Sequence, residues 1–574
     1  MRLFTLQILL FGCLLTAGCS VPWTQKEPES ELHKRRDAIQ EVLRSDERPQ
    51  LIGDAVAIVG TDTREYEGFG IVNGLMDTGG DVRPGSQRNF ILNEMRAEGV
   101  NTPNLVLGSK TTAMARLRVF VGPECAKGDL VDLAVEVADD CDASSLRNGW
   151  LMPSRIHEMQ FLGGSNRQSE LKARAHGALV ILPASVTKKE LNSRSAVVLG
   201  GAKVLESRTF IIRIRDTLRH VTTAAAISRA INEHYSFYDG AERKGVASAK
   251  NDKVIQLEIP ARHRWDIQHY TDTILAIGFV EESDERTARI ARCRRLLTEP
   301  TAARQASLEL EAMGKEGVPA LEEGLQSDNP EIRFYAAYSL AYLDHSPAVP
   351  VLRELAKTVP EFRPLCLTGL QLLKHHSAKD ALELLLQEDE AELRYGALLA
   401  LRRRDAQDAI VQGTRVGDLT HVVSVPSNKP LVTVSLQERP EIVIFGENIG
   451  VQMKDFFEVN SRLVMRSEPD GQIRLVRFQP SDENLTAIVS PDLSSVVEGF
   501  QKIGGKYNDI VCWLDEASRQ NWLSAPIAMN PRPMAGRVYY RDAEAKARNE
   551  ASGSVDIAQS SIERPEKKSW WKRK

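Results

Sequence analysis

Two periodicities of apolar residues divide the chain into regions. In residues 51–283 and again after Gln407, apolar and polar residues alternate over short stretches, which indicates half-buried β-strands. Between residues 298 and 406 the apolar residues recur at the three- and four-residue spacing of helices. The pattern predicts an α+β protein in which a helical segment separates two sheet-containing regions.

The alternating regions contain recognisable strands and a few helices. The clearest expected strands are 119–121, 131–137, 210–214, 255–259, LVTVSL, EIVIF, SRLVM and IRLVRF. SQRNFILNEMRAEGV predicts a helix that ends near Gly99, a typical C′ residue, and TTAAAISRAINEH predicts a second helix. A third expected helix places Val496, Phe500 and Ile503 on one face.

The helical region repeats itself. Its helices align so that an arginine recurs at spacings of 29, 30 and 31 residues, at Arg304, Arg333, Arg363 and Arg394. Self-similarity of this kind is typical of stacked helix pairs, and the units resemble short bacterial HEAT repeats. We expect an α-solenoid over 298–406, with the arginines paired to acidic residues such as Glu331 and Glu392 rather than to a ligand.

The stretch EGFGIVNGLMDTGGD contains several glycines but does not have the pattern of a phosphate-binding loop. Gly68, Gly70 and Gly74 are spaced GxGxxxG, and no Gly-Lys-Ser/Thr follows them. Ile71 and Val72 indicate a strand. We therefore expect these glycines, together with Gly79, to permit close backbone packing and a turn.

The N-terminus predicts export. Residues 1–19 have one positive charge, an apolar run and Thr-Ala-Gly-Cys, which resembles a lipobox with Cys19 as the acylated residue, although Thr16 stands where Leu is usual. Ordinary signal cleavage is the alternative. Residues 20–50 read as a polar linker, and 541–574 as a disordered charged tail ending in KKSWWKRK, which would either be solvated or touch an anionic surface.

Composition narrows the range of functions. The chain has 574 residues, enough for several domains. Its net charge of −4 does not indicate the basic surface that nucleic-acid binding requires. No arrangement of Ser/His/Asp, Cys/His or HExxH predicts a catalytic, metal or cofactor site. Asp139, Asp140 and Asp142 form an acidic cluster in an expected turn, where solvation is more usual than catalysis, and His375-His376 is expected to be exposed at a helix end.

Two cysteines flank an expected strand. Cys125 and Cys141 lie on either side of residues 131–137, and export would expose them to an oxidising space. They would either form a disulfide bridge or remain thiols, because connectivity does not follow from sequence.

The order of several segments resembles one known family. GFGIVNGLMDTGGD, RVFVGPECAKGDLVDLAVEVADDCDASSLRNGWLMPSRI, HGALVI, TTAAAISRAINEHY and KVIQLEIPA resemble, in this order, segments of the flagellar basal-body P-ring protein family. PEIVIFGENIGVQMKDFFEVNSRLVM and SSVVEGFQKIGGKYNDIVCWLDEASRQNWL are similar to its later segments. The likeness covers 51–283 and 407–524. The chain departs from the family at Asp77, where Gly is usual, and at the additional Gly80.

The resemblance implies P-ring-like α+β domains at 51–283 and 407–540, a structural role without catalytic residues, and a periplasmic ring of identical subunits around the flagellar rod. It also implies contacts with outer L-ring proteins and peptidoglycan. We expect the two regions to form one body from which the helical array protrudes. The alternative is an envelope lipoprotein adaptor that binds an unknown protein through the helical repeats, and deletion of 298–406 would separate the two.

Overall fold

The computed structural model describes residues 34, 36–39, 50–162, 165–183, 193–239, 242–417, 420–453, 456–479 and 482–542. The export, lipidation and tail predictions for residues 1–19, Cys19 and KKSWWKRK therefore lie outside the described residues. Within the described part, no helix combines the length and apolar character needed to cross a membrane.

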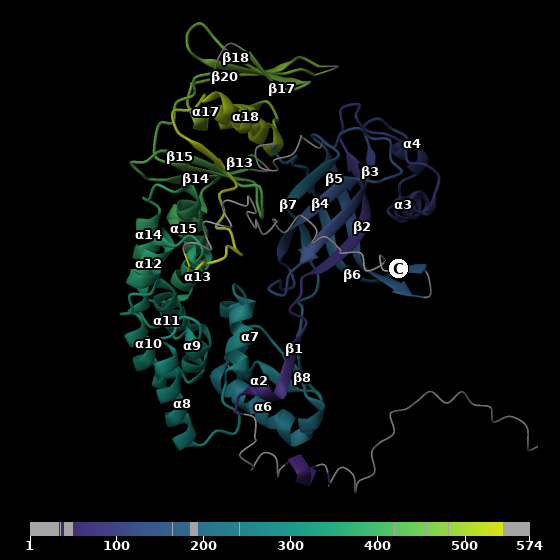
Figure 1. The fold of residues 1–574 in the computed structure, drawn as a ribbon. Helices are drawn as coiled ribbons and strands as arrows, with labels where there is room; N and C mark the ends of the chain where they lie inside the picture. Colours follow the sequence, from purple (N-terminus) through teal and green to yellow (C-terminus); the bar gives the residue numbers. More distant parts are fainter. Residues whose placement is uncertain are drawn as a thin grey trace, which may run out of the picture.

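A closed six-stranded barrel forms the largest part of the first α+β region (Figure 1). The strand order is β2-β3-β4-β7-β6-β5, with neighbours antiparallel. The strands are β2 (Arg64–Asn73), β3 (Ala113–Val121), β4 (Leu130–Val137), β5 (Trp150–Leu162), β6 (Ser165–Ala178) and β7 (Ser195–Val204). Helices α3 (Ser86–Ala97) and α4 (Pro103–Leu107) lie in the β2–β3 connection. The α3 prediction is confirmed, with Gly99 at φ +82°.

The barrel is inserted into a second, smaller unit, which we call the base. Its sheet has the order β1-β8-β12-β11, so the chain leaves the base after β1 and returns at β8. Its elements are α2 (Ile52–Ala55), β1 (Val56–Val59), β8 (Phe210–Ile214), η1 (Asp216–Leu218), α6 (Val221–His234), β9 (Ser236–Asp239), β10 (Glu242–Gly245), β11 (Ala247–Ala249), β12 (Val254–Leu257), η2 (Ala261–His263) and α7 (Ile267–Leu275).

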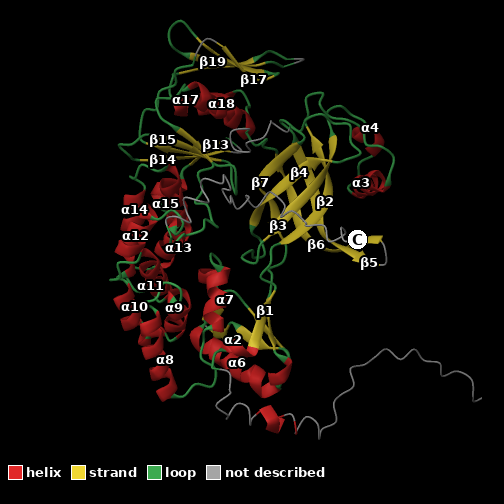
Figure 2. Ribbon diagram, in the orientation of Figure 1, coloured by secondary structure: helices red, strands yellow, loops and turns green. Residues whose placement is uncertain are grey.

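A stack of helices follows, and Figure 2 shows them gathered along one side of the molecule. They are α8 (Ser283–Leu296), α9 (Ala303–Ala312), η3 (Gly314–Glu316), α10 (Val318–Gly324), α11 (Pro330–Tyr342), α12 (Ala348–Thr358), α13 (Arg363–Leu372), α14 (His376–Leu385), α15 (Ala391–Arg404) and α16 (Ala409–Gln412). Helices α9, α11, α13 and α15 contact one another in that order, and α12 contacts α14. The predicted helical region is thus observed, whereas its identity as HEAT repeats stays a prediction.

The C-terminal region contains two sheets with two helices between them (Figures 1 and 2). The five-stranded sheet has the order β13-β14-β16-β15-β21, and the other has the order β17-β18-β19-β20. The elements are β13 (Thr414–Val416), β14 (Thr420–Val425), β15 (Leu431–Val434), β16 (Glu441–Phe445), β17 (Phe456–Asn460), β18 (Leu463–Ser467), β19 (Ile473–Arg477), β20 (Leu485–Val489), α17 (Leu493–Lys502), α18 (Tyr507–Gln520) and β21 (Ile527–Met529).

The helix stack is built into the molecule at both ends. Leu308 and Ala312 of α9 belong to the apolar core of the base. At the other end, Val423, Val443 and Phe445 of the C-terminal sheet belong to the core of the stack. The expectation that the array protrudes is therefore wrong, because its terminal helices complete the cores of both neighbours and would otherwise leave apolar surface in water.

After β21 the chain returns along the stack. Residues 530–542, here called the strap, contact α15, α13 and α11 in turn, as described below. The strap is the yellow segment beside α13 and α15 in Figure 1.

Candidate functional site

The glycines of the signature stretch bring strand β2 close to its neighbours. A Cβ atom added to Gly68 would lie 2.7 Å from the carbonyl oxygen of Arg155 in β5, and one at Gly70 would collide with the Ser154 hydroxyl. The β2–β5 register is irregular between Glu67 and Val72. The prediction of close backbone packing at these two glycines agrees with this geometry.

The loop after β2 is held by the backbone of the β2–β3 connection. Gly74 has φ +77° and starts the loop, and the Gly79 amide donates to the Lys110 carbonyl at 2.7 Å. A Cβ atom at Gly79 would lie 2.6 Å from the same oxygen. Asp77 has φ +58°, a conformation that Asp tolerates better than most residues, which explains how it stands where the family usually has Gly.

The loop carries Met76 to a seam between the barrel and the C-terminal region. A second loop, residues 142–149, packs beside it, because the Ser144 amide donates to the Thr78 carbonyl at 2.8 Å. This second loop places Asn148, which is buried and has φ +62°, next to Met76.

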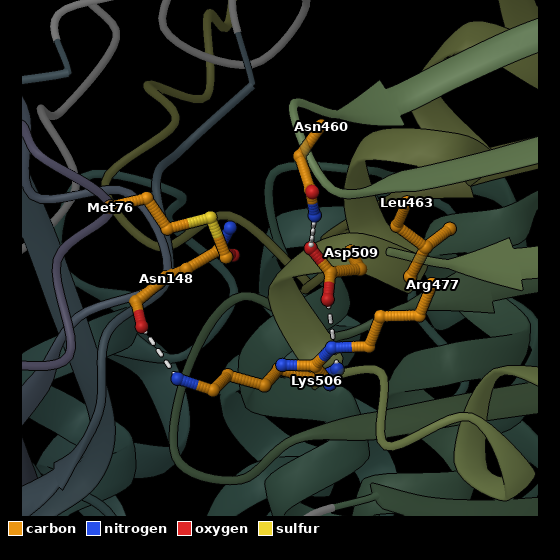
Figure 3. Close-up of a pocket in the computed structure, with 7 residues that line it drawn as sticks. All are labelled: Met76, Asn148, Asn460, Leu463, Arg477, Lys506 and Asp509. Atoms are coloured by element: carbon orange, nitrogen blue, oxygen red, sulfur yellow. Dashed lines mark hydrogen bonds between the residues drawn. The ribbon is translucent and has the colours of Figure 1, made fainter. Parts of the chain in front are cut away.

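A small pocket lies at this seam (Figure 3). Its lining residues come from both sides of the seam: Met76, Asn148, Asn460, Leu463, Arg477, Lys506 and Asp509. The Lys506 ammonium donates to the Asn148 carbonyl at 2.5 Å. The Asp509 carboxylate accepts from the Asn460 side-chain amide at 2.8 Å and from the Lys506 backbone amide at 2.9 Å.

Burial changes the acid–base properties of the two charged groups. It raises the pKa of the Asp509 carboxyl above its usual value and lowers the pKa of the Lys506 ammonium. Both oxygens of Asp509 accept hydrogen bonds from the C-terminal region itself. The arrangement therefore fixes the start of α18 and directs Lys506 at the barrel, which is chemistry suited to joining two bodies.

Further polar contacts extend the seam. The Ile181 amide donates to the Asn508 side chain at 2.9 Å, and Asn508 is almost fully buried. Val180, Val197 and Leu199 of the barrel region belong to the apolar core of the C-terminal region. The two regions thus share both hydrogen bonds and buried apolar surface.

A second link joins strand β4 to the C-terminal region. The Asp132 carboxylate accepts from the Gly200 amide at 2.8 Å and from the Glu438 amide at 2.9 Å. Burial raises the pKa of this carboxyl, while the two amides act in the opposite direction. Glu438 is in turn paired with Arg532 at 2.6 Å.

The candidate disulfide is not formed. Cys125 and Cys141 are both free and buried. Cys125 precedes β4 and Cys141 follows it, so the two cysteines lie beyond opposite ends of an extended strand. Burial raises the pKa of the Cys125 thiol to about 11.

The other singled-out polar residues lie apart from the seam pocket. Asp139, Asp140 and Asp142 are exposed, and His375 and His376 are exposed at the start of α14, where the His375 ring accepts from the Ser377 amide. No group of three or more potential metal ligands occurs among the described residues.

The four repeated arginines have separate partners. Arg304 pairs with Asp272, Arg333 with Glu354 and Arg363 with Glu392, whereas Arg394 donates to backbone carbonyls and lies over the Phe445 ring. The expected Arg363–Glu392 type of pairing is present. Glu331, however, pairs with Arg541 of the strap, a partner that sequence alignment of the repeats did not indicate.

Sequence reasoning missed the residues that form the seam. Asn148 and Lys506-Tyr-Asn-Asp509 lie within segments that carry the family resemblance, yet Asn148 and Lys506, which bind each other, are 358 residues apart in the sequence. Covariation between the two segments would be the signal that reveals such a pair.

Comparison with known proteins finds that the first part of the chain is similar to one family. Residues 51–291 match the family model described as flagellar P-ring protein. The flagellar P-ring protein of Caulobacter vibrioides is 29% identical over 217 residues, which are 36% of this chain and 55% of that protein. That of Caulobacter sp. strain K31 is 27% identical over 218 residues, 37% and 55% of the two chains. The chain thus spans about half the length of these relatives.

Two solved structures align with part of the chain, both with a TM-score of 0.18, which carries no information about fold or chemistry here. One is human deoxyhypusine hydroxylase in complex with glycerol, at 25% identity over 21% of this chain and 44% of that chain. The other is the complex of CpcE and CpcF of phycocyanin lyase from Nostoc sp. PCC7120, at 28% identity over 21% and 81%.

The matched range begins at the residue where the sequence predicted the first region to begin, and it contains the signature loop of the seam. The resemblance of residues 407–524 lies beyond that range and stays a prediction. The predicted resemblance to the flagellar P-ring protein family is confirmed for residues 51–291 of this chain.

Proposed function

We propose that this chain is a structural component of the bacterial flagellar basal body, a P-ring-like protein that assembles around the rod in the periplasm. The family match of residues 51–291 carries the proposal. The seam supports it, because the signature loop of the matched region packs against the later region that also resembles the family.

In this proposal identical subunits form a closed ring through head-to-tail contacts, so each subunit presents two different complementary faces. The flagellar rod, outer L-ring proteins and peptidoglycan are its neighbours. Cys19 would add a lipid anchor in the outer membrane. No catalytic residue, cofactor or metal ion takes part.

Electron microscopy of isolated basal bodies tests the proposal. A gold label attached at Lys315, an exposed residue of η3, marks the helix stack in each subunit. We expect a ring of labels around the rod at the level of the periplasm. A purified chain that remains monomeric and is absent from labelled basal bodies would contradict the proposal.

The second candidate is an envelope adaptor that binds another protein through the helix stack. The observation that favours it is the strap, which shows that the stack already holds an extended segment on its surface. Deletion of 298–406 is not a clean test, because it would open the cores of the base and the C-terminal region. A photo-crosslinker at Leu384, which is 54% exposed on α14, is sharper. Adducts with a protein outside the basal body would favour the adaptor.

A further inference from the structure

The strap binds the helix stack through two forked ion pairs. The Arg537 guanidinium donates to both carboxylate oxygens of Glu392, each at 2.8 Å, and to the Pro360 carbonyl at 3.3 Å. The Arg541 guanidinium donates to both oxygens of Glu331, at 2.6 and 2.8 Å, and to the Pro300 carbonyl at 3.2 Å. Two parallel hydrogen bonds of this kind fix both position and orientation.

The two acidic partners occupy equivalent places in the repeats. Glu331 lies in the first turn of α11, and Glu392 lies in the first turn of α15. The Glu331 side chain is only 5% exposed, so its charge is taken out of water between the stack and Arg541. A partner for these sites therefore needs cations at the same spacing as the two helix starts.

An aromatic contact lies between the two ion pairs. The Tyr539 ring stacks on Phe362 with centroids 4.7 Å apart, and Phe362 stacks on Phe334 of α11 at 4.3 Å. Nearer the start of the strap, Pro533 packs against Gly396 of α15, where an added Cβ atom would meet the proline ring. The strap therefore contacts successive helices of one row, in the order α15, α13 and α11.

This contact is separable from the rest of the fold. None of the described strap residues belongs to a helix or strand. The ion pairs of Arg537 and Arg541 are side-chain contacts that the same helices on another copy would offer unchanged, whereas Arg532 at the start of the strap stays paired with Glu438 of its own C-terminal region. A segment tethered to its own groove has an effective concentration in the millimolar range, and neighbouring subunits in an assembly reach similar values. Exchange between copies then costs little free energy.

We propose that the row formed by α11, α13 and α15 is a peptide-binding groove, and that in the assembled protein it receives the strap of a second copy. The groove selects an extended segment with arginines four residues apart and an aromatic residue between them. Each copy gives its strap to one neighbour and receives a strap from the other, which is a head-to-tail contact. The inference deepens the proposed ring and rests on it only for placing copies side by side.

Two complementary full-length variants test the exchange. The donor carries Glu331→Gln and Glu392→Gln, so its groove lacks the two carboxylates that bind Arg541 and Arg537, and its strap is intact. The acceptor carries Arg537→Ala and Arg541→Ala, so its strap lacks both cations and its groove is intact. We expect each variant to sediment as a monomer and an equimolar mixture to sediment as a 1:1 complex, with the affinity falling at least about tenfold from low to high salt.

The matched control replaces the acceptor with Arg519→Ala, an exposed arginine of α18 outside the strap. Its own strap keeps its own groove closed, so it should give at least about tenfold less complex with the donor. A synthetic peptide of residues 530–542 should compete with the donor for the acceptor. Circular dichroism establishes that each variant is folded. Where it is not, the single changes Glu331→Gln and Arg541→Ala replace the double ones, because Glu392 also pairs with the buried Arg363.

A mixture of folded donor and acceptor that sediments as two monomers would overturn the exchange. If labelled rings are still present in basal bodies, only the strap exchange fails and the proposed function stands. If donor and acceptor form the complex but no ring is found, the groove is established and the proposed function fails.

Discussion

The barrel and the helix stack build their apolar cores from different kinds of contact. In the barrel, β2 pairs with β3 and with β5, so residues such as Glu67 and His157 meet across a long stretch of chain. In the stack, each helix of the row contacts the next unit about 30 residues away, for example at the Arg363–Glu392 pair. Barrel geometry thus depends on distant backbone, and stack geometry depends on side chains that repeat.

The difference also applies to how each body joins the rest of the molecule. The barrel meets the C-terminal region at a seam that adds buried hydrogen bonds, such as that from the Ile181 amide to Asn508, to a shared apolar core. The stack merges with both neighbours through continuous apolar cores. We therefore expect steric clashes and lost hydrogen bonds to destabilise the barrel most. The stack should be destabilised most by loss of buried charge partners or apolar contacts.

The largest effect is expected from Gly79→Ala in the barrel loop. The added methyl group would meet the backbone carbonyls of Lys110 and Thr112, which cannot move without breaking the connection to β3. We expect a loss of at least about 3 kcal/mol of unfolding free energy for the barrel. Urea unfolding followed by hydrogen exchange of barrel amides measures it.

Gly99→Ala is the matched control for Gly79, because no atom lies within 4 Å of its added Cβ and the change imposes only the cost of its positive φ. A loss at Gly79 no larger than the loss at Gly99 would show that the loop adjusts, and the contrast between rigid barrel backbone and adaptable stack would not hold.

In the stack, Arg363→Ala is expected to lower the free energy of unfolding by about 3 kcal/mol. The guanidinium is 1% exposed and donates to the Ala356 carbonyl and to Glu392, so its removal leaves the buried Ala356 carbonyl without its donor and an unfilled space between the helices. Differential scanning calorimetry of the full chain measures the shift. Arg304→Ala, at a repeat-equivalent but 56% exposed arginine, should cost below about 1 kcal/mol. An equal decrease in the free energy of unfolding for the two variants would show that the position in the repeat, rather than burial, determines how much each arginine stabilises the stack.

The helical part of the fold was predictable because its pattern is local. Each helix of the repeats shows its apolar spacing within a dozen residues, and the equivalent arginines align directly. Individual strands were also predictable, since β4 of the barrel and β8 of the base follow the expected alternation. Closure of the barrel could not be predicted, because nothing in the β2 sequence shows that Gly70 faces Ser154.

The seam and the strap were unpredictable for a related reason. Lys506 reaches the backbone carbonyl of Asn148, and a carbonyl carries no side-chain identity that a sequence pattern could show. Arg541 belongs to a segment whose composition indicates disorder, yet it pairs with Glu331 more than 200 residues earlier. Composition describes what a segment does alone, and here a preformed groove orders it.

Acid is expected to weaken the joint between the base and the stack through His263. Burial lowers the pKa of this imidazole to about 3, and its ring stacks on Tyr342 of α11 at 5.3 Å. Since the folded pKa lies below the unfolded value of about 6.5, the stabilisation is present above pH 6.5 and is lost as the pH falls toward 3.

The His263→Gln variant isolates this effect. Between pH 7.5 and pH 4.5 we expect this group alone to lower the free energy of unfolding of the wild type by on the order of 2 kcal/mol. The decrease for the variant should be smaller by the same amount. His269 provides the opposite sign at the same joint: burial acts to lower its pKa, but the Glu311 carboxylate at 2.8 Å raises it overall. Melting temperatures at both pH values measure the difference, and identical pH dependence of variant and wild type would exclude His263 as its source.

The smallest effect is expected at the seam, from Asn508→Ala. The side chain accepts from the Ile181 amide at 2.9 Å inside a buried contact, so the variant leaves that amide without its acceptor. We expect the free energy of unfolding to fall by about 1–2 kcal/mol, confined to the seam, because the apolar contacts of Val180, Val197 and Leu199 with the C-terminal core remain. Hydrogen exchange of the Ile181 amide should speed up about tenfold or more, while amides inside β3 remain protected. Equal acceleration in β3 would show that the seam and the barrel unfold as one unit, and the distinction between a hydrogen-bonded seam and an apolar stack junction would then disappear.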